Sequence, residues 1–188
     1  VARYPRTHNT ATVWPEPLLA CARADDPEFM RLKHAVGANH KIPQDLLPDA
    51  RTVLAYFVPF NINTVKSNIP GKEASREWAL AYIETNRLIM DLNQHIYEET
   101  AKRGYSCSRI PPTHNFDREK LISDWSHRHV ACIAGLGTLG YNNMLITEKG
   151  CCGRVGSFVT NVELEPTPRP VQENCLYKRY GTCRACVK

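Results

Sequence analysis

The sequence predicts an α/β or α+β fold in which helices pack on a layered sheet. The run TVLAYFVPF, residues 52–60, is apolar throughout, which favours a strand buried on both faces at the centre of a sheet. Residues 75–104 repeat apolar side chains at a helical period, and further helix-like and strand-like segments are interspersed along the chain. Such a mixture favours a layered architecture over a helical bundle or a β-sandwich.

The first half of the chain contains one short and one long helix. Residues 1–49 are rich in proline and are expected to be irregular apart from a helix over 25–37, where Pro27 stands in the first turn and Gly37 ends the helix. The helix over 75–104 is the clearest of the chain. One of its faces is expected to pack in the core through Trp78, Tyr82, Ile89, Leu92 and Ile96.

A strand over 105–110 and a second helix over 123–137 are expected next. Ser123 or Asp124 would cap this helix, and Gly135 would end it. Both ends are therefore marked by residues that favour helix boundaries.

The two histidines of this second helix are expected in different surroundings. A step of ~100° per residue places His129 within an apolar face formed by Trp125, Cys132 and Ile133, and His127 on the opposite side. His129 is interpreted as a hydrogen-bonded core histidine, whereas His127 is either a solvated side chain or a site residue.

The last third of the chain is expected to contain two strands, 144–150 and 153–164, joined by the turn KGCCG. The segment EPTPRP that follows is an extended connector stiffened by proline. It divides the chain into an α/β domain, 1–165, that binds a cofactor or substrate, and a short cysteine-containing segment, 166–188.

Composition and charge indicate which classes of protein this sequence can belong to. Apolar residues at 43% and charged residues at 23% are typical of a globular protein, and the longest apolar run is far short of the ~20 residues that span a bilayer, so we expect no membrane association. A net charge of +5 is compatible with an acidic partner such as RNA and equally with an ordinary solvated surface. Eight cysteines without a secretory leader predict a cytoplasmic protein that uses them for metal or redox chemistry. Because the sequence begins with Val and ends inside a cysteine motif, we expect it to be part of a longer polypeptide.

The cysteines near the end of the sequence are candidate metal ligands. Cys183 and Cys186 have the spacing of the first pair in the iron-sulfur run C-x2-C-x2-C-x3-C, and the next two ligands would fall at positions 189 and 193. Cys175 lies too far upstream to belong to the same run. Tetrahedral zinc, with Cys151 or Cys152 as a fourth ligand, and thiols without any metal are the alternatives.

A glycine-rich segment, AGLGTLGYNN, follows the second helix. Gly135, Gly137 and Gly140 are spaced like a dinucleotide-binding fingerprint, but that motif requires a strand before the glycines and a helix after them, and here the order is reversed. Two interpretations remain open. The glycines form a helix end and a tight turn, or they let the backbone approach a large planar ligand.

The stretch HVACIAGLGTLGYNNMLITEKGCCGRVGSFVTNVELEPTP, followed by a CxxC pair, resembles the epoxyqueuosine reductase and reductive dehalogenase superfamily. The resemblance covers about residues 120–188. The matching positions are Ala134 to Gly137, Gly140, Asn142, Leu145, Gly156, Thr160, Asn161, Leu164 and Pro166.

This resemblance implies a nitroreductase-like α/β domain that binds cobalamin, followed by the start of a ferredoxin-like segment whose [4Fe-4S] cluster delivers electrons. It also implies an electron donor protein and a tRNA or small-molecule substrate as partners. In that family the loop after AGLG lies against the corrin ring. The cofactor contacts implied here are Gly137, Thr138, Gly140, Asn142 and Asn143.

The sequence departs from the tRNA-modifying members of the family at their proton donor. Their Asp-[Ser/Thr]-[Ala/Gly]-Pro motif is missing, and its position falls near Leu121. Asp124 is the candidate replacement, with a helix cap as the alternative. His114, in the loop PPTHNFD, and His127 are further candidate catalytic residues.

These observations predict an iron-sulfur oxidoreductase of the epoxyqueuosine-reductase-like group, in which a [4Fe-4S] cluster passes electrons to a bound corrinoid or to the substrate. A zinc-stapled RNA-binding module and a non-catalytic electron carrier are the alternatives.

Overall fold

Strand β2, Thr52–Pro59, forms the centre of the main sheet in the computed structural model, which describes residues 1–187. It pairs with β1, Leu18–Arg23, along one edge and with β7, Gly153–Thr160, along the other. Both pairings are antiparallel. The predicted strand is thus confirmed, and its continuous apolar run follows from helices that cover both faces of the sheet.

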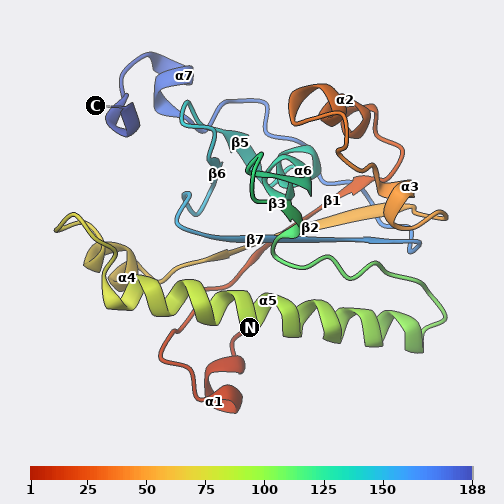
Figure 1. Cartoon of the computed structure of the whole chain (residues 1–188), viewed down its shortest axis with the longest axis horizontal. Helices are drawn as coiled ribbons and strands as arrows, with labels where there is room; N and C mark the ends of the chain where they lie inside the picture. The colour runs from red at the N-terminus through yellow and green to blue at the C-terminus, as the bar shows by residue number, and fades with distance from the viewer. Residues whose placement is uncertain (188) are drawn as a thin grey trace.

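Successive side chains of β2 pack into two separate hydrophobic clusters. Phe57 belongs to a cluster that packs against α6, whereas Tyr56 and Val58 belong to a second cluster with side chains of α5. Figure 1 shows α5, in yellow-green, running beneath the sheet and α6 lying above it. The combination of helices and small antiparallel sheets is an α+β architecture, as predicted.

Helix α5, Arg76–Lys102, confirms the long predicted helix, and Ser75 caps it by accepting a hydrogen bond from the backbone N–H of Trp78. Its predicted core face is partly wrong, because Tyr82 is 46% exposed. The buried positions include two polar residues. Thr85 accepts a hydrogen bond from the Trp14 indole at 2.7 Å, and Asn93 accepts one from the Tyr56 hydroxyl at 2.7 Å.

Helix α2, Pro27–Ala35, confirms the short predicted helix, with the Asp26 side chain accepting from the N–H of Glu28. The rest of the first 49 residues is more regular than predicted, since it contains strand β1. Three further short helices that precede α5 were not predicted: α1 (Tyr4–His8), α3 (Pro43–Leu46) and α4 (Ile62–Ser67).

The strand predicted over 105–110 is wrong. This segment makes only an isolated bridge, from Cys107 to Thr160, beside the edge of β7. A hairpin follows, formed by β3 (His114–Asp117) and β4 (Ile122–Trp125).

Helix α6, His127–Ala134, begins at Ser126 and not at Ser123 or Asp124, so that part of the prediction is wrong. The reason is that Asp124 belongs to β4, where its side chain binds residues of β3. The predicted end is confirmed, because Gly135 adopts a left-handed conformation with φ 98°.

The remaining elements follow α6 along the chain. Strands β5 (Gly137–Leu139) and β6 (Leu145–Thr147) form a hairpin, and the short helices α7 (Leu176–Tyr180) and η1 (Ala185–Val187) follow the extended connector. In Figure 1, α7 lies beside the β5–β6 hairpin. None of the helices within residues 1–187 combines the length and apolarity required to span a bilayer.

Candidate functional site

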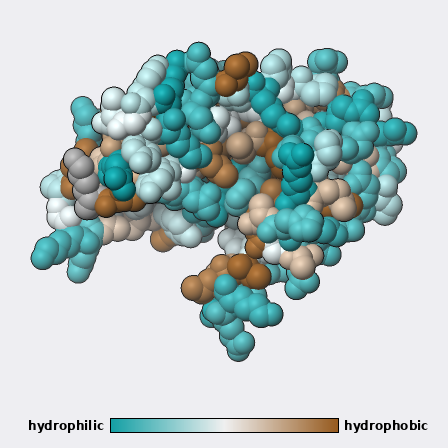
Figure 2. Space-filling view, turned by 90° about the horizontal axis from the view of Figure 1, so that it is seen from above, coloured by the Kyte–Doolittle hydropathy of each residue, from teal (hydrophilic) through white to brown (hydrophobic). Residues whose placement is uncertain are grey.

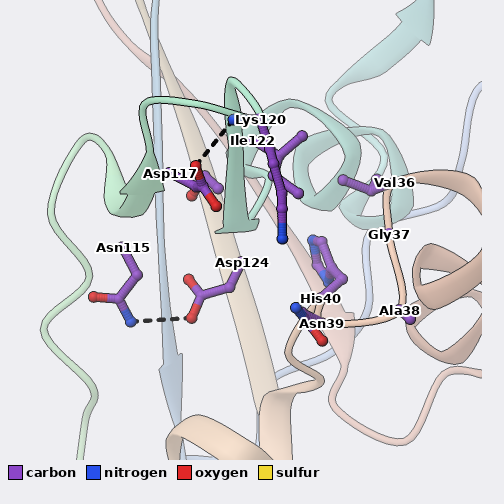
Figure 3. Close-up of a pocket in the computed structure, with 11 residues that line it drawn as sticks. Val36, Gly37, Ala38, Asn39, His40, Asn115, Asp117, Lys120, Ile122 and Asp124 are labelled. Carbon is purple, nitrogen blue, oxygen red and sulfur yellow. Dashed lines mark hydrogen bonds between the residues drawn. The ribbon is translucent and has the colours of Figure 1, made fainter.

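A cavity of about 310 Å³ lies between the loop after α2 and the β3–β4 hairpin. Figure 3 shows the side chains around it, which come from these two segments. Its size falls within the range of small-molecule sites. Its lining residues are Val36, Gly37, Ala38, Asn39, His40, Asn115, Asp117, Lys120, Ile122, Ser123 and Asp124.

Asp124 is the carboxylate of this wall that accepts its hydrogen bonds from side chains. His114 Nδ1 donates to its Oδ1 at 2.5 Å, and Asn115 Nδ2 donates to its Oδ2 at 3.0 Å. Partial burial acts to raise the pKa of Asp124, but the hydrogen bonds from His114 and Asn115 outweigh it and hold the pKa below its usual value. Asp124 is therefore ionised at neutral pH.

The hairpin brings these residues together through its register. His114 stands opposite Trp125, the residue after Asp124, and the Ser123 hydroxyl donates to the backbone carbonyl of His114. Asn115 has a positive φ of 44°, a conformation that asparagine tolerates better than most residues. Two predicted site residues, Asp124 and His114, thus form one pair.

His40 completes the site from a distant part of the sequence. Its ring is 2% exposed, its Nδ1 donates to the carbonyl of Lys41 at 2.7 Å, and its Nε2 accepts the backbone N–H of Ser126 at 3.0 Å. Burial lowers the pKa of His40, which favours the neutral ring that this arrangement requires. The Lys41 N–H also donates to the backbone carbonyl of Asp124 at 2.8 Å. His40 was not predicted from the sequence. The one feature that could have indicated it is its position shortly after Gly37, the residue predicted to end the preceding helix.

Asp117 and Lys120 line the outer part of the cavity. Asp117 Oδ1 accepts the backbone N–H groups of Glu119 and Lys120, each at 2.9 Å. These hydrogen bonds, that from Lys120 first, lower the pKa of Asp117 despite its partial desolvation. The wall therefore presents two carboxylates and one ammonium group.

His127 does not line this cavity. It was expected on the side opposite the apolar face of its helix, but it is buried against the sheet, because Ser157 and Pro111 supply polar partners there. Its Nε2 donates to the Pro111 carbonyl at 2.8 Å, so its Nδ1 accepts from the Ser157 hydroxyl at 2.8 Å. Burial lowers the pKa of His127 to about 4. Both nitrogens are engaged inside the protein, while the predicted catalytic role stays a prediction.

His129 is half-buried, and its Nδ1 lies 2.7 Å from the Ser126 hydroxyl. Desolvation lowers its pKa. The hydrogen bond agrees with the interpretation of a hydrogen-bonded core histidine, but the core position does not, because His129 is only half-buried.

The glycine-rich segment forms the turn of the β5–β6 hairpin. A Cβ on Gly137 would lie 2.2 Å from the backbone oxygen of Ile146, and the Gly140 N–H donates to the Met144 carbonyl at 2.7 Å. Both glycines are thus explained by close packing within the hairpin. Asn142 and Asn143 are exposed at its tip.

The cysteine-containing tail packs on this same hairpin. The backbone N–H of Asn174 donates to Thr138 Oγ1 at 2.8 Å, and Lys178 Nζ donates to the Leu139 carbonyl at 2.6 Å. The rings of Tyr141 and Tyr177 meet edge to face with centroids 4.8 Å apart. The predicted cofactor contacts of the glycine-rich segment and the predicted metal ligands of the tail therefore lie in neighbouring segments. A cavity of about 350 Å³ beside Gly135 and Leu136 adjoins them and includes Asn174.

Cys175 stands at the N-cap position of α7 and is buried, whereas Cys183 and Cys186 are exposed. Backbone N–H groups, that of Lys178 first and then those of Tyr141 and Tyr177, lower the pKa of the Cys175 thiol. This environment favours the thiolate, the form that binds metals.

Cys151 and Cys152 lie elsewhere, in the turn between β6 and β7, where they line an apolar cavity of about 560 Å³ with Phe60 and Ile62. Across residues 1–187, the structure brings no three histidine, cysteine or acidic side chains into a metal-binding group. The predicted role of the five cysteines as ligands stays a prediction.

Comparisons with known proteins identify the fold. No family model matches the chain, and no curated protein matches it. Solved structures do. Epoxyqueuosine reductase from Streptococcus thermophilus superposes over 85% of this chain with a TM-score of 0.52 and 18% sequence identity. The chain has the fold of epoxyqueuosine reductase.

Two further epoxyqueuosine reductase structures each superpose over 90% of the chain with a TM-score of 0.56 and 20% identity. One contains an epoxyqueuosine-modified tRNA-Tyr stem loop, and the other, from Bacillus subtilis, has its catalytic aspartate loop swung out of the active site. The chain spans about half the length of these structures, 46% of each. The resemblance to epoxyqueuosine reductase found in the sequence is thus confirmed as a shared fold.

Proposed function

We propose that this chain is part of an iron-sulfur oxidoreductase of the epoxyqueuosine-reductase-like group, which acts in the cytoplasm. The observation that carries the proposal is the packing of the cysteine tail on the β5–β6 hairpin, in a chain with the fold of epoxyqueuosine reductase. The cavity at Asp124 is the proposed reaction pocket. An electron donor protein would supply the reducing equivalents.

The tail residues fit an iron-sulfur cluster in their chemistry. Cys175, Cys183 and Cys186 are thiols without disulfide bonds, and the N–H groups around the Cys175 sulfur favour its thiolate. A nitroreductase-like domain followed by a ferredoxin-like segment is the corresponding domain organisation, with the boundary at residue 165. A bound [4Fe-4S] cluster would supply one-electron transfer.

The residues around the glycines fit a corrinoid less well. The backbone of Ile146 fills the space that a Cβ on Gly137 would take, and the side chains of Asn142 and Ile146 fill it at Gly140, so the hairpin itself accounts for both glycines. Thr138 is engaged by Asn174, which leaves Asn142 and Asn143 as the exposed candidate contacts. We therefore assign no step to a corrinoid.

A tRNA stem loop is the proposed substrate class. The support is the fold shared with the structure that contains an epoxyqueuosine-modified stem loop, together with the net charge of +5. A small molecule bearing an equivalent oxidised group is the alternative substrate.

The test is anaerobic reconstitution of the full-length protein that contains this chain with iron and sulfide, followed by metal analysis and by visible and EPR spectroscopy. Iron uptake with broad visible absorption is expected, and it should fall in C175S, C183S and C186S but not in C21S, a matched change in strand β1. Added cobalamin tests the corrinoid in the same samples. A protein that takes up no iron contradicts the proposal, whether or not it binds cobalamin.

A zinc-stapled RNA-binding module is the second candidate. The observation in its favour is an exposed group of aromatic and basic side chains, in which the Arg184 guanidinium lies 5.2 Å from the centroid of the Tyr177 ring. Stoichiometric zinc without visible absorption, together with RNA binding that weakens as salt rises, would favour this candidate.

A further inference from the structure

We propose that His114 is a positioning residue for Asp124, and that it makes Asp124 a hydrogen-bond acceptor for a hydroxyl or protonated amine of the ligand. The inference rests on the proposed function only in taking this cavity as the reaction pocket. It differs from a role for Asp124 as proton donor, the role that the resemblance implies.

The hydrogen bonds of the carboxylate support the acceptor role. One oxygen receives the His114 ring N–H and the other receives the Asn115 amide, so a proton on Asp124 would compete with an existing donor. An ionised carboxylate offers about four lone-pair positions, and these two bonds leave others for a ligand.

The position of His114 shows how it would act. Asp124 lines the cavity, whereas His114 does not. Its side chain is 19% exposed, and its backbone carbonyl is held by the Ser123 hydroxyl. His114 would therefore affect a bound ligand only indirectly, by positioning the Asp124 carboxylate.

The surroundings of the pair maintain the charge of Asp124. Besides His114, the basic groups near it are Lys41, whose charge lowers the pKa of Asp124, and His40, which is buried at the same cavity. Lys120 and Asp117 line the same cavity. On the other side of His114, burial keeps His127 neutral near pH 7.

The other walls fit a polar ligand that carries donor groups. Asn39 and Asn115 provide amides, Asp117 provides a second carboxylate, and Val36 and Ile122 provide apolar contacts. In Figure 3 the side chains of Asp124, Lys120 and His40 surround the same space. Two ionised acceptors on one wall favour a ligand with hydroxyl or ammonium groups over an anion.

The first test needs no enzymatic activity. The Asp124 carboxyl is titrated by ¹³C NMR in the wild type, H114A and H114N, with D124N for assignment and H95A, an exposed change on α5, as control. H114A should raise the pKa of Asp124, and H114N should restore it in part, because an asparagine amide can donate from nearly the same place. An unchanged pKa of Asp124 in H114A would overturn the proposal.

The second test measures kcat/KM against pH in the reconstituted protein with an epoxyqueuosine-bearing stem loop. H114A should lose about 10- to 100-fold, as loss of an orienting partner does at other sites, and H114N should recover most of it. Activity should fall on the acid side, and this limb should move to higher pH in H114A, since the carboxylate form is required. Activity that rises on acidification would refute the acceptor role. A wild type that takes up iron but reduces nothing would count against the proposed function, while the NMR titration would still decide the role of His114.

Discussion

Replacing Ser157 with alanine should destabilise the protein strongly, although only one oxygen atom is lost. Ser157 is fully buried, and its hydroxyl accepts from the Trp125 indole at 2.9 Å and contacts His127 Nδ1 at 2.8 Å. The change leaves two buried polar groups without partners. Each costs about 1–3 kcal/mol, which gives about 2–6 kcal/mol for the pair.

Reversible unfolding in urea measures this loss, and the melting temperature should fall by about 2–4 °C for each kcal/mol in a chain of this size. S106A is the matched control, because Ser106 is exposed, and it should stay within about 0.5 kcal/mol of the wild type. A loss below about 1 kcal/mol in S157A would refute the reasoning. It would mean that water or a shifted side chain satisfies both groups.

Three further results are expected. Burial lowers the pKa of His127 from 6.5 to about 4, so the folded state disfavours its protonated form. The free energy of unfolding should therefore decline by about 3 kcal/mol as the pH falls from 6.5 to 4. Urea unfolding measured across this range should show a weaker decline in H127N. G137A should destabilise the protein more than G150A. The new Cβ of G137A would clash with the backbone of Ile146, whereas G150A would only place an alanine in a strained backbone conformation, φ 83°, with open space around its Cβ. Equal losses in thermal unfolding would contradict this. T85V should cost about 1–3 kcal/mol in urea unfolding, since it leaves a buried indole N–H without an acceptor, and a neutral effect would count against that bond.

The elements predicted correctly are those whose signals are local. Strand β2 is apolar along its whole length, and α5 has both a serine cap and a helical period. Strand β1 has neither signal: Leu19 is 65% exposed and the buried residues are small, so pairing with β2 decides its conformation. The start of α6 was misplaced because the pairing of His114 with Trp125 draws the preceding residues into a hairpin.

The candidate site was predicted only in part, because its residue types can be read from the sequence but the contacts between them cannot. Asp124 and His114 were singled out by residue type, but their contact depends on hairpin register, which composition does not encode. His40 lies more than eighty positions before Asp124, and only the tertiary fold brings it there. Figure 2 shows a mostly hydrophilic surface with small apolar patches, and no broad patch on that face could have pointed to the site.

The route of the chain from β7 to α7 has a mechanical consequence. Thr167 exchanges hydrogen bonds with the backbone of Cys21, Arg169 donates to the Ile133 carbonyl, and Asn174 donates to Thr138. With three successive anchor points, the connector is tethered to the domain as far as Asn174. The segment that carries Cys175 therefore starts from a defined position beside the β5–β6 hairpin, and a redox centre built there would begin its electron path next to that hairpin.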